Sequence, residues 1–395
     1  MITVSPERAI SVRVVFRIIL PLFLLTLLFD FVGGAFLGAY FEKLMFSYPA
    51  ILIILPGLMG LRGNVFGSLG SRISTRLYIG DLEPSLRERH VSNNILLSIV
   101  ASSLPAFILW LISVIKLRSP ALDALEIVIS SSVFIGLILG IATAWVVILA
   151  FRRKIDPDNV AGPAITTIAD MVSIPGLILF ILLFERFNSL VHLLFILVLL
   201  FLIVATFTIW RFEERIVARE VFTIVTILAV FQSFTGATLQ TFSHIIYSSL
   251  ILSFAYPAII GSLGNYGSII AARTSTKLHL GEITGRITGD DLKEILSFAS
   301  ISPILSVLII ILSWLLASLT GLPVESLIFW KIILIFASVY IPLSIAIMLL
   351  SYHISVLLYN RRIDPDNGGI PAITTIADLA GTFAIAFISY IIIKI

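Results

Sequence analysis

The chain contains no cysteine and carries little charge. Of its 395 residues, 12% are Asp, Glu, Lys or Arg and 59% are hydrophobic. The missing thiols exclude disulfides, thiolate metal sites and iron–sulfur clusters. A soluble chain carries charge on about a quarter of its residues, since even a large core leaves a surface that water must wet. The composition therefore indicates an all-α polytopic membrane protein, in which we expect no sizeable soluble catalytic or regulatory domain.

Net charge and histidine content are low as well. The 26 basic and 23 acidic residues give a formal net charge of +3, too small to favour a nucleic-acid partner. Of the five histidines, His244, His279 and His353 lack the spacing of metal ligands, so we expect no transition-metal site. The N-terminal residues contain no small-residue cleavage site after a short apolar core, and we therefore expect no signal peptide.

Apolar runs bounded by charged or turn residues predict eleven membrane-spanning helices. Several runs exceed the about 20 residues that a bilayer requires, so we expect these helices to tilt or to project into the cytoplasm. The predicted spans are 14–40, 46–79, 93–115, 124–151, 160–184, 188–210, 218–242, 246–280, 294–319, 326–359 and 368–393.

The distribution of lysine and arginine predicts the orientation of these helices. With the N-terminus in the cytoplasm and the C-terminus outside, 19 basic residues fall in cytoplasmic segments and six fall outside. The remaining one, Arg62, lies inside the second span. Positive residues concentrate on the cytoplasmic side of membrane proteins. We therefore expect a multi-pass protein of the cell membrane with this orientation.

The sequence contains an internal duplication. Ile155–Asp170 reads IDPDNVAGPAITTIAD and Ile363–Asp378 reads IDPDNGGIPAITTIAD, so that 13 of 16 positions are identical. A second motif is repeated at an offset of 201 residues, where Pro56–Asn64 (PGLMGLRGN) matches Pro257–Asn265 (PAIIGSLGN). The chain therefore consists of two five-helix repeats, each with the same pair of motifs in its second and fifth spans.

One predicted span, 188–210, has no counterpart in either repeat. Because five is an odd number, a direct fusion would leave the repeats inverted, and this extra span gives both repeats the same orientation. A peripheral helix without this role is the alternative, but deleting the span would place the basic loops of the second repeat outside. We predict parallel repeats at 1–187 and 212–395, joined by a linking helix at 188–211, with a pseudo-two-fold axis along the membrane normal.

Each fifth span contains a carboxylate well inside the hydrocarbon region. Such charges are costly and usually face a partner or a water-filled path. Helical spacing places Thr166, Pro163 and Asn159 on the face of Asp170. The second repeat presents the same face with Asp378, Thr374, Pro371 and Asn367.

These two faces predict a site for a hard divalent cation. The pseudo-two-fold axis would bring together two carboxylates, two hydroxyls and carbonyls that the prolines free from helical hydrogen bonds. An all-oxygen site with two negative charges suits Mg²⁺, which keeps part of its water shell. The alternative is a pair of protonated or hydrogen-bonded aspartates that only hold helices together.

The second span of each repeat contributes a face of small residues and one amide. The glycines favour close helix packing. Asn64 and its match Asn265 either line a pore or bond a neighbouring helix, and the sequence leaves both roles open.

Other charged residues are secondary candidates. Asp156, Asp158, Asp364 and Asp366 begin the fifth spans, where an N-terminal capping role and attraction of cations are both open. Asp30 in the first span aligns with Gln232, and Arg62 aligns with Leu263. Arg62 either pairs with Asp30 or repels anions, and Asp30 is an asymmetric candidate ion site.

The two motifs resemble those of a known family. The run Leu58–Asn64 (LMGLRGN), followed by Ser71–Thr75 (SRIST) and by the Asp-Pro-Asp-Asn…Pro…Asp pattern of the fifth spans, is similar to the MgtE and solute carrier family 41 magnesium transporters. The duplicated halves resemble the solute carrier branch, which implies a pseudo-dimeric monomer. The resemblance implies a cation path between the second and fifth spans, with Asp170 and Asp378 at the principal site and Asn64 and Asn265 in the pore.

The chain also departs from the MgtE pattern. MgtE proteins carry cytoplasmic sensor domains that close the pore when magnesium is plentiful, and we expect none in this chain. The pattern places a glycine two residues after the asparagine, which Gly267 satisfies, whereas the first repeat has Phe66 there. Pore symmetry is therefore expected to be imperfect.

The leading hypothesis is Mg²⁺ transport by a channel or by an exchanger with Na⁺ as coupling ion. No segment resembles a nucleotide-binding loop, so pumping driven by ATP within this chain is excluded. A membrane-embedded lipid-modifying enzyme would require a further nucleophile or metal triad, and none is found. We expect no enzymatic activity. Transport of another divalent cation stays open.

Overall fold

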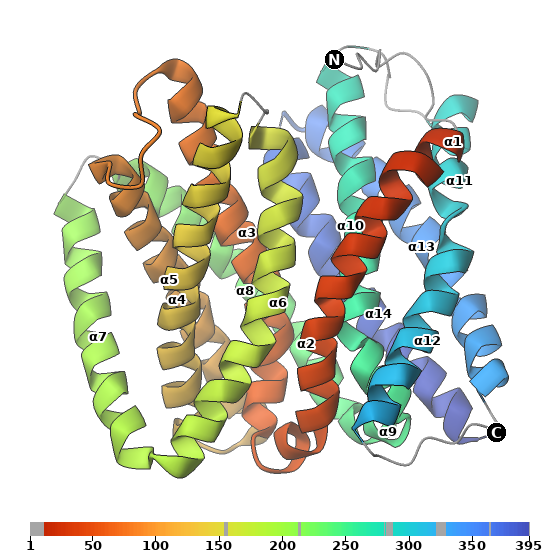
Figure 1. Cartoon of the computed structure of the whole chain (residues 1–395), viewed down its shortest axis with the longest axis horizontal. Coiled ribbons are helices and arrows are strands. Elements are labelled where there is room, and N and C mark those ends of the chain that lie inside the picture. The colour runs from red at the N-terminus through yellow and green to blue at the C-terminus, as the bar shows by residue number, and fades with distance from the viewer. Residues whose placement is uncertain are drawn as a thin grey trace. The chain divides into compact units, whose positions relative to one another are not determined.

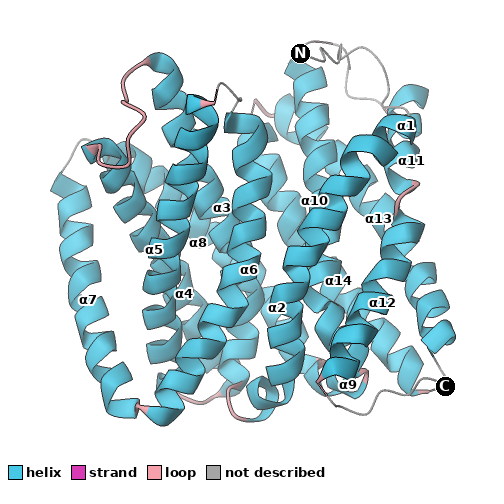
Figure 2. Ribbon diagram, in the orientation of Figure 1, coloured by secondary structure: helices cyan, strands magenta, loops and turns pink. Residues whose placement is uncertain are grey.

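The computed structural model describes residues 12–153, 157–211, 215–279, 281, 287–320, 329–362 and 365–394. These residues form helices and connecting loops, with no strand among them (Figures 1 and 2). In chain order the helices are α1 (Val12–Val14), the π-helical turn η1 (Val15–Ile19), α2 (Leu20–Phe46), α3 (Pro49–Ile79), α4 (Arg89–Leu117), α5 (Leu122–Arg152), α6 (Pro157–Arg186), α7 (Asn188–Arg211), α8 (Arg215–Thr241), α9 (Ser243–Ser248), α10 (Leu250–His279), α11 (Gly289–Ala299), α12 (Ser302–Leu319), α13 (Phe329–Asn360) and α14 (Pro365–Ile393).

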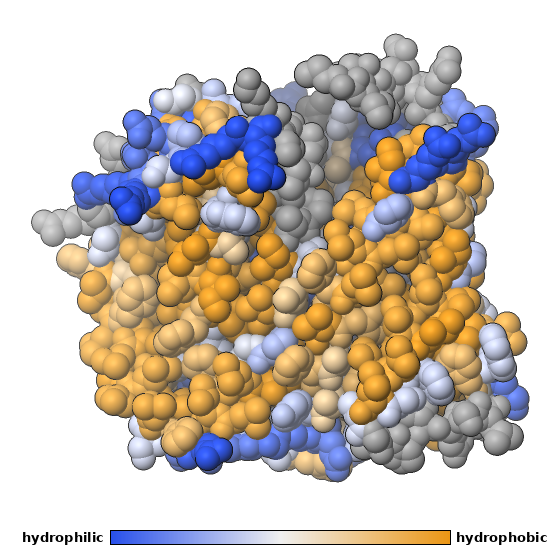
Figure 3. All heavy atoms as spheres, viewed as in Figure 1, coloured by the Kyte–Doolittle hydropathy of each residue, from blue (hydrophilic) through white to orange (hydrophobic). Residues whose placement is uncertain are grey.

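Ten helical segments of the described chain are long and apolar enough to cross a membrane, judged by length and composition. Figure 3 shows apolar side chains along the sides of the helices and hydrophilic ones near their ends. The eleventh predicted span, 246–280, corresponds to α10, which has 30 residues but whose apolar run is interrupted by small and polar residues. The all-helical, multi-pass character is therefore confirmed.

The predicted span 294–319 is not one continuous helix. α11 ends at Ala299 and α12 begins at Ser302, with Pro303 in the first turn of α12. Proline has no N–H to bond the carbonyl of residue 299 and its ring crowds that turn, which explains the break. A similar separation divides α9 from α10 within the predicted span 246–280.

The chain divides into two compact units. One unit consists of Met1–Ala39 and Phe242–Ile395 and is called here the Asp378 unit. The other, Tyr40–Thr241, is called the Asp170 unit. These units do not coincide with the predicted repeats, because the first helix of each predicted repeat packs with helices of the other. The division into two sequence repeats stays a prediction.

Aligned glycines make this exchange of first helices possible. Within the Asp378 unit, a Cβ atom on Gly34 of α2 would overlap the carbonyl oxygen of Phe254 in α10. Within the Asp170 unit, a Cβ atom on Gly236 of α8 would overlap the carbonyl oxygen of Ile53 in α3. Only glycine permits so close an approach of two backbones. The second helix of each repeat is therefore covered by the first helix of the other.

The second helix of each repeat also lies at the centre of its unit. α3 packs against α4, α5, α6 and α8, and its residues from Ile51 to Leu55 are buried. α10 packs against α9, α12, α13 and α14. In both units the fifth helix of the predicted repeat, α6 or α14, therefore runs beside the helix that carries the asparagine of the repeated motif.

Candidate functional site

The two candidate aspartates lie on the helices that contact α3 and α10. Asp378 is buried on α14, and α14 packs along α10. Asp170 is half-buried on α6, and α6 packs along α3. Each unit therefore holds its predicted carboxylate beside the helix that carries its predicted asparagine.

Thr374 lies one turn before Asp378 and is close to α10. A Cβ atom on Gly264 of α10 would lie 3.8 Å from the Thr374 methyl carbon. The Thr374 hydroxyl donates a hydrogen bond of 3.1 Å to the carbonyl of Pro371, and Thr375 donates another of 2.9 Å to the same carbonyl. These hydroxyls bond their own helix, as threonines in helices often do, and their oxygens keep acceptor capacity for a ligand.

A tyrosine and a threonine that the sequence analysis missed hold the Asp378 turn in place. The Thr382 hydroxyl donates to the carbonyl of Asp378 at 2.7 Å. Because its single hydrogen is used there, the buried Tyr256 donates to the Thr382 oxygen, at 2.9 Å. This chain of hydrogen bonds joins α10 to the part of α14 that presents Asp378. The position of Thr382, four residues after Asp378, was the available sequence signal.

Asn265 bonds a neighbouring helix, one of the two roles left open by the sequence. Its Nδ2 donates to the Thr26 hydroxyl of α2 at 3.3 Å. This bond fixes the plane of the amide and does not use Oδ1.

Asp30 lies on α2, one turn after Thr26, and faces α10. Its carboxylate is 3% exposed, and a Cβ atom on Gly261 would lie 2.8 Å from Asp30 Oδ2. The hydroxyl of Tyr340, which interacts electrostatically with Asp30, donates to Ser262 at 2.8 Å. The Asp378 unit therefore contains a second buried carboxylate, set against α10 through a glycine.

The Asp170 unit has a different set of charges at the equivalent positions. Gln232 of α8, aligned with Asp30, is buried. Arg62, aligned with the buried Leu263, is 2% exposed, and its Nη2 donates to the Ser132 hydroxyl of α5 at 3.3 Å. Arg62 is two residues from the half-buried Asn64, so the two side chains leave α3 on nearly opposite sides.

Five predicted site residues cannot be placed in this geometry. Asp156 and Asp364 lie outside the described residues, and so do the side chains of Asp158, Thr166 and Asp366. Among the residues that are described, no three His, Asp or Glu side chains gather as a metal-ligand group.

Comparison with known proteins identifies the family. The sequence profile of MgtE, described as a divalent cation transporter, matches residues 55–182 and 256–388, one match in each repeat. No solved structure matches the chain.

Individual relatives are similar at modest identity. Solute carrier family 41 member 3 of Rattus norvegicus is 25% identical over 370 residues, covering 85% of this chain and 78% of the relative. Solute carrier family 41 member 2 of Homo sapiens is 29% identical over 255 residues, covering 60% of this chain and 44% of the relative. The chain thus spans about half the length of the member 2 relatives.

A bacterial relative is similar over a shorter region. Magnesium transporter MgtE of Bacillus subtilis is 26% identical over 156 residues, covering 39% of this chain and 34% of the relative. With the profile matched in both repeats, the resemblance predicted from the motifs is confirmed, and the family is one of transporters rather than enzymes. The chain belongs to the MgtE family of divalent cation transporters.

Proposed function

We propose that this chain transports Mg²⁺ across the membrane, along a pathway lined by α3 and α6 of one repeat and by α10 and α14 of the other. The observation that carries the proposal is the repeated pairing of a buried or half-buried aspartate with a neighbouring helix that presents an asparagine. The family description, divalent cation transporter, and the names of the relatives support Mg²⁺ as the substrate.

Asp170 and Asp378 are the principal ligands in this proposal. Thr166, Thr374, Asn64 and Asn265 supply neutral oxygens around them. Asp30 and the four aspartates that begin the fifth spans, Asp156, Asp158, Asp364 and Asp366, are secondary positions that attract cations toward the pathway.

The site holds Mg²⁺ through its water shell. One carboxylate, one threonine and one amide from each repeat are too few to replace the shell of an ion that sheds water reluctantly. Outer-sphere contact also separates Mg²⁺ from Ca²⁺, which exchanges water readily and takes six to eight direct ligands at about 2.3–2.6 Å. We therefore expect cobalt hexammine, which has the shape of hydrated Mg²⁺ but keeps its ligands, to inhibit Mg²⁺ flux competitively.

The membrane potential is sufficient to drive the ion. For a doubly charged ion it supplies about 4.6 kcal/mol per 100 mV. A channel requires only this gradient, whereas an exchanger would couple Mg²⁺ to a second ion, for which Na⁺ is the candidate.

The proposed architecture is an eleven-helix pseudo-dimeric monomer. α10 serves as the eleventh span, because its polar stripe faces the pathway rather than lipid. The linking helix α7 gives both repeats the same orientation, with the N-terminus in the cytoplasm and the C-terminus outside.

Flux into proteoliposomes tests the proposal. The purified chain is reconstituted in vesicles loaded with a Mg²⁺-sensitive dye, and uptake is recorded with and without a Na⁺ gradient, with Ca²⁺ as the competing cation. Uptake above that of empty vesicles supports transport, and its dependence on Na⁺ separates exchanger from channel. Uptake equal to empty vesicles under both conditions contradicts the proposal.

A further inference from the structure

Arg62 is a buried positive charge near the middle of α3. Its side chain is 2% exposed, and the helix around it is the candidate membrane span Pro49–Tyr78. Among the described residues, Arg62 makes one hydrogen bond, from Nη2 to the hydroxyl of Ser132 at 3.3 Å, and no ion pair. A guanidinium has five N–H donors and stays charged at neutral pH. Because charges at membrane depth are costly, one neutral hydroxyl does not account for this one.

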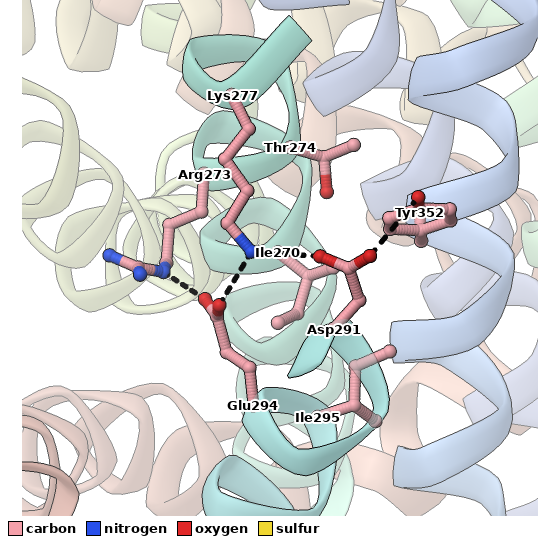
Figure 4. Close-up of a pocket in the computed structure, with 8 residues that line it drawn as sticks. All are labelled: Ile270, Arg273, Thr274, Lys277, Asp291, Glu294, Ile295 and Tyr352. Atoms are coloured by element: carbon pink, nitrogen blue, oxygen red, sulfur yellow. Dashed lines mark hydrogen bonds and ion pairs between the residues drawn. The ribbon is translucent and has the colours of Figure 1, made fainter. Parts of the chain in front are cut away.

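The charges at the end of α10 are treated differently. Lys277 Nζ donates to Asp291 Oδ1 at 2.9 Å and to Glu294 Oε2 at 2.8 Å, and Arg273 Nε donates to Glu294 Oε1 (Figure 4). In this ion-pair cluster, two positive charges meet two nearly buried carboxylates of the same chain. The contrast indicates that the charge of Arg62 has a partner of another kind.

The face of α3 that carries Arg62 is turned toward α6. Phe66, one turn after Arg62, shares a buried core cluster with Ile165 of α6. The aligned residues meet in the Asp378 unit as well, where a Cβ atom on Gly267 would lie 2.8 Å from Cγ1 of Ile373. The two helix pairs, α3 with α6 and α10 with α14, therefore pack in the same register.

This shared register places Arg62 beside Asp170. In the Asp378 unit, a Cβ atom on Gly381 of α14 would lie 3.2 Å from Cδ1 of Leu263, the residue aligned with Arg62. Gly381 aligns with Ser173 of α6, which is buried and whose Oγ has no hydrogen-bond partner among the described residues. Ser173 follows Asp170 by about one turn, a rise of about 5.4 Å that an arginine side chain spans. Arg62 is therefore within reach of the proposed ligand.

We propose that Arg62 is an internal cation that competes with the transported ion for Asp170, an inference that rests on the proposed function. With Mg²⁺ at Asp170, the guanidinium stays on the Ser132 hydroxyl of α5. As the ion leaves, the guanidinium turns toward α6, where the Ser173 oxygen accepts a hydrogen bond and the positive charge offsets that of the carboxylate. Arg62 thereby assists the release of the ion.

The competition makes the two repeats unequal as cation sites. Leu263 is aligned with Arg62, so the side chain that faces α14 at this position is neutral. A positive charge about one turn from a site repels a doubly charged ion strongly in a poorly polarisable interior. Asp170 is therefore the weaker ligand and Asp378 the stronger one. A pathway needs sites that an ion enters readily and also leaves.

Cation binding by the full-length chain in detergent tests this role without requiring transport. Calorimetry measures the dissociation constants of Mg²⁺ and of cobalt hexammine, which carries three charges. Arg62→Leu introduces the residue of the other repeat, and Arg62→Lys keeps the charge. Ser132→Ala removes the hydroxyl that holds the guanidinium away from Asp170. Asp170→Asn, alone and combined with Arg62→Leu, shows whether the effect acts through this carboxylate.

We expect Arg62→Leu to bind Mg²⁺ at least about tenfold more tightly, and to gain more for cobalt hexammine, since repulsion scales with the charge of the ion. Arg62→Lys should stay within about threefold of the wild type, because the charge is kept. Ser132→Ala should bind about twofold to tenfold more weakly, because the guanidinium loses the hydrogen bond that competes with Asp170. In the Asp170→Asn background, the gain from Arg62→Leu should fall below about threefold.

Three results would overturn the proposal. One is an Arg62→Leu affinity within threefold of the wild type. The second is a change in the same direction for Arg62→Leu and Ser132→Ala, which a purely structural contact between the two side chains would give. The third is a wild-type affinity that changes when gluconate replaces chloride while that of Arg62→Leu does not, which would assign the charge to a bound anion.

The same measurements separate this inference from the proposed function. A chain that shows the expected differences in binding but no Mg²⁺ flux in proteoliposomes supports the role of Arg62 and contradicts transport alone. A wild-type chain that binds neither Mg²⁺ nor cobalt hexammine contradicts both.

Discussion

The Asp170 unit and the Asp378 unit contain the same motifs but support them with different charges. Both place an aspartate beside a helix that carries an asparagine. The surrounding residues differ: Arg62 and Gln232 of the Asp170 unit align with Leu263 and Asp30 of the Asp378 unit. At the ends of α3 and α10, Arg76 bonds His90 and Arg72 bonds Asn94, whereas the aligned Lys277 and Arg273 bond Asp291 and Glu294.

The comparison distinguishes the residues that are the same in both units from the charged residues that differ between them. Each of these differences makes the Asp170 unit more positive or less negative than the Asp378 unit. The proposed ligands are the same in both units, as expected if the proposed pathway requires them twice, whereas the surrounding charges differ. A dimer of identical subunits could not contain such a difference.

The largest expected effect concerns the retained aspartates. We expect Asp170→Asn and Asp378→Asn each to reduce Mg²⁺ flux by roughly tenfold to a hundredfold, because each removes charge-assisted hydrogen bonds to the hydrated ion. Flux per folded protein is measured in proteoliposomes, with elution from a sizing column as the folding control. Near-normal flux in the double variant would contradict the site.

The second prediction compares the ion pairs that Arg273 and Lys277 form with Asp291 and Glu294 with the neutral contact of Arg72 and Asn94. Glu294→Gln leaves Arg273 and Lys277 beside a neutral amide, and we expect a loss of about 2–4 kcal/mol in unfolding free energy. This is slightly below the loss for a fully buried pair, because Arg273 is 28% exposed. The matched variant Asn94→Ala removes a neutral acceptor from Arg72 and should cost only about 1 kcal/mol. Unfolding in mixed micelles measures both, and equal losses would show that the charge difference has no energetic role.

The third prediction tests whether the two exchanged first helices depend equally on their glycines. Gly34→Ala and Gly236→Ala each place a methyl group on a carbonyl oxygen of the facing helix, so backbones must separate. We expect each to lose about 1–3 kcal/mol of stability. Gly67→Ala is the control, because no atom lies within 4 Å of its added Cβ, and it should be neutral or slightly stabilising. Unequal losses at Gly34 and Gly236 would indicate that one helix pair, α2 with α10 or α8 with α3, packs more closely than the other.

Hydropathy and repetition made much of this fold predictable. The predicted span 188–210 and the observed α7 differ by one residue, since charged residues bound a long apolar run. The break between α11 and α12 was missed, because the apolar run continues across it and Pro303 was the only signal. The exchange of α2 and α8 could not be predicted, since hydropathy does not say which repeat a helix packs against.

The candidate site was predictable only where the motif repeats. Asp170, Asp378 and the asparagines follow from two copies of one pattern. Tyr256 and Thr382 are 126 residues apart and meet through the packing of α10 on α14, so no local pattern reveals them. The ion-pair cluster was missed for the same reason, because Asp291 and Glu294 have no carboxylate counterparts in the first repeat.

The smallest expected effect concerns Tyr48, which lies directly before the N-terminal end of α3. Tyr48 lies between the candidate spans Val12–Phe46 and Pro49–Tyr78, and its hydroxyl donates to Glu185, which also pairs with Lys43. The residue aligned with Tyr48 in the other repeat is Ser249, so this contact belongs to the Asp170 unit alone. Because Glu185 and Lys43 are about one-third exposed, we expect Tyr48→Phe to lose less than about 1 kcal/mol of stability.

The pH dependence of that small loss identifies its cause. Burial, and then the charge of Glu185, raise the pKa of the Tyr48 phenol from 10.0 to about 12. The folded state therefore favours the neutral phenol, and the stability that this group contributes is fully present below pH 10. It declines as the pH rises from 10 through about 12, where the folded protein loses the proton as well. The stability difference between wild type and Tyr48→Phe should thus be constant from pH 7 to 10 and shrink above it. A stability advantage of the wild type that increases above pH 10 would show that the folded state does not favour the neutral phenol.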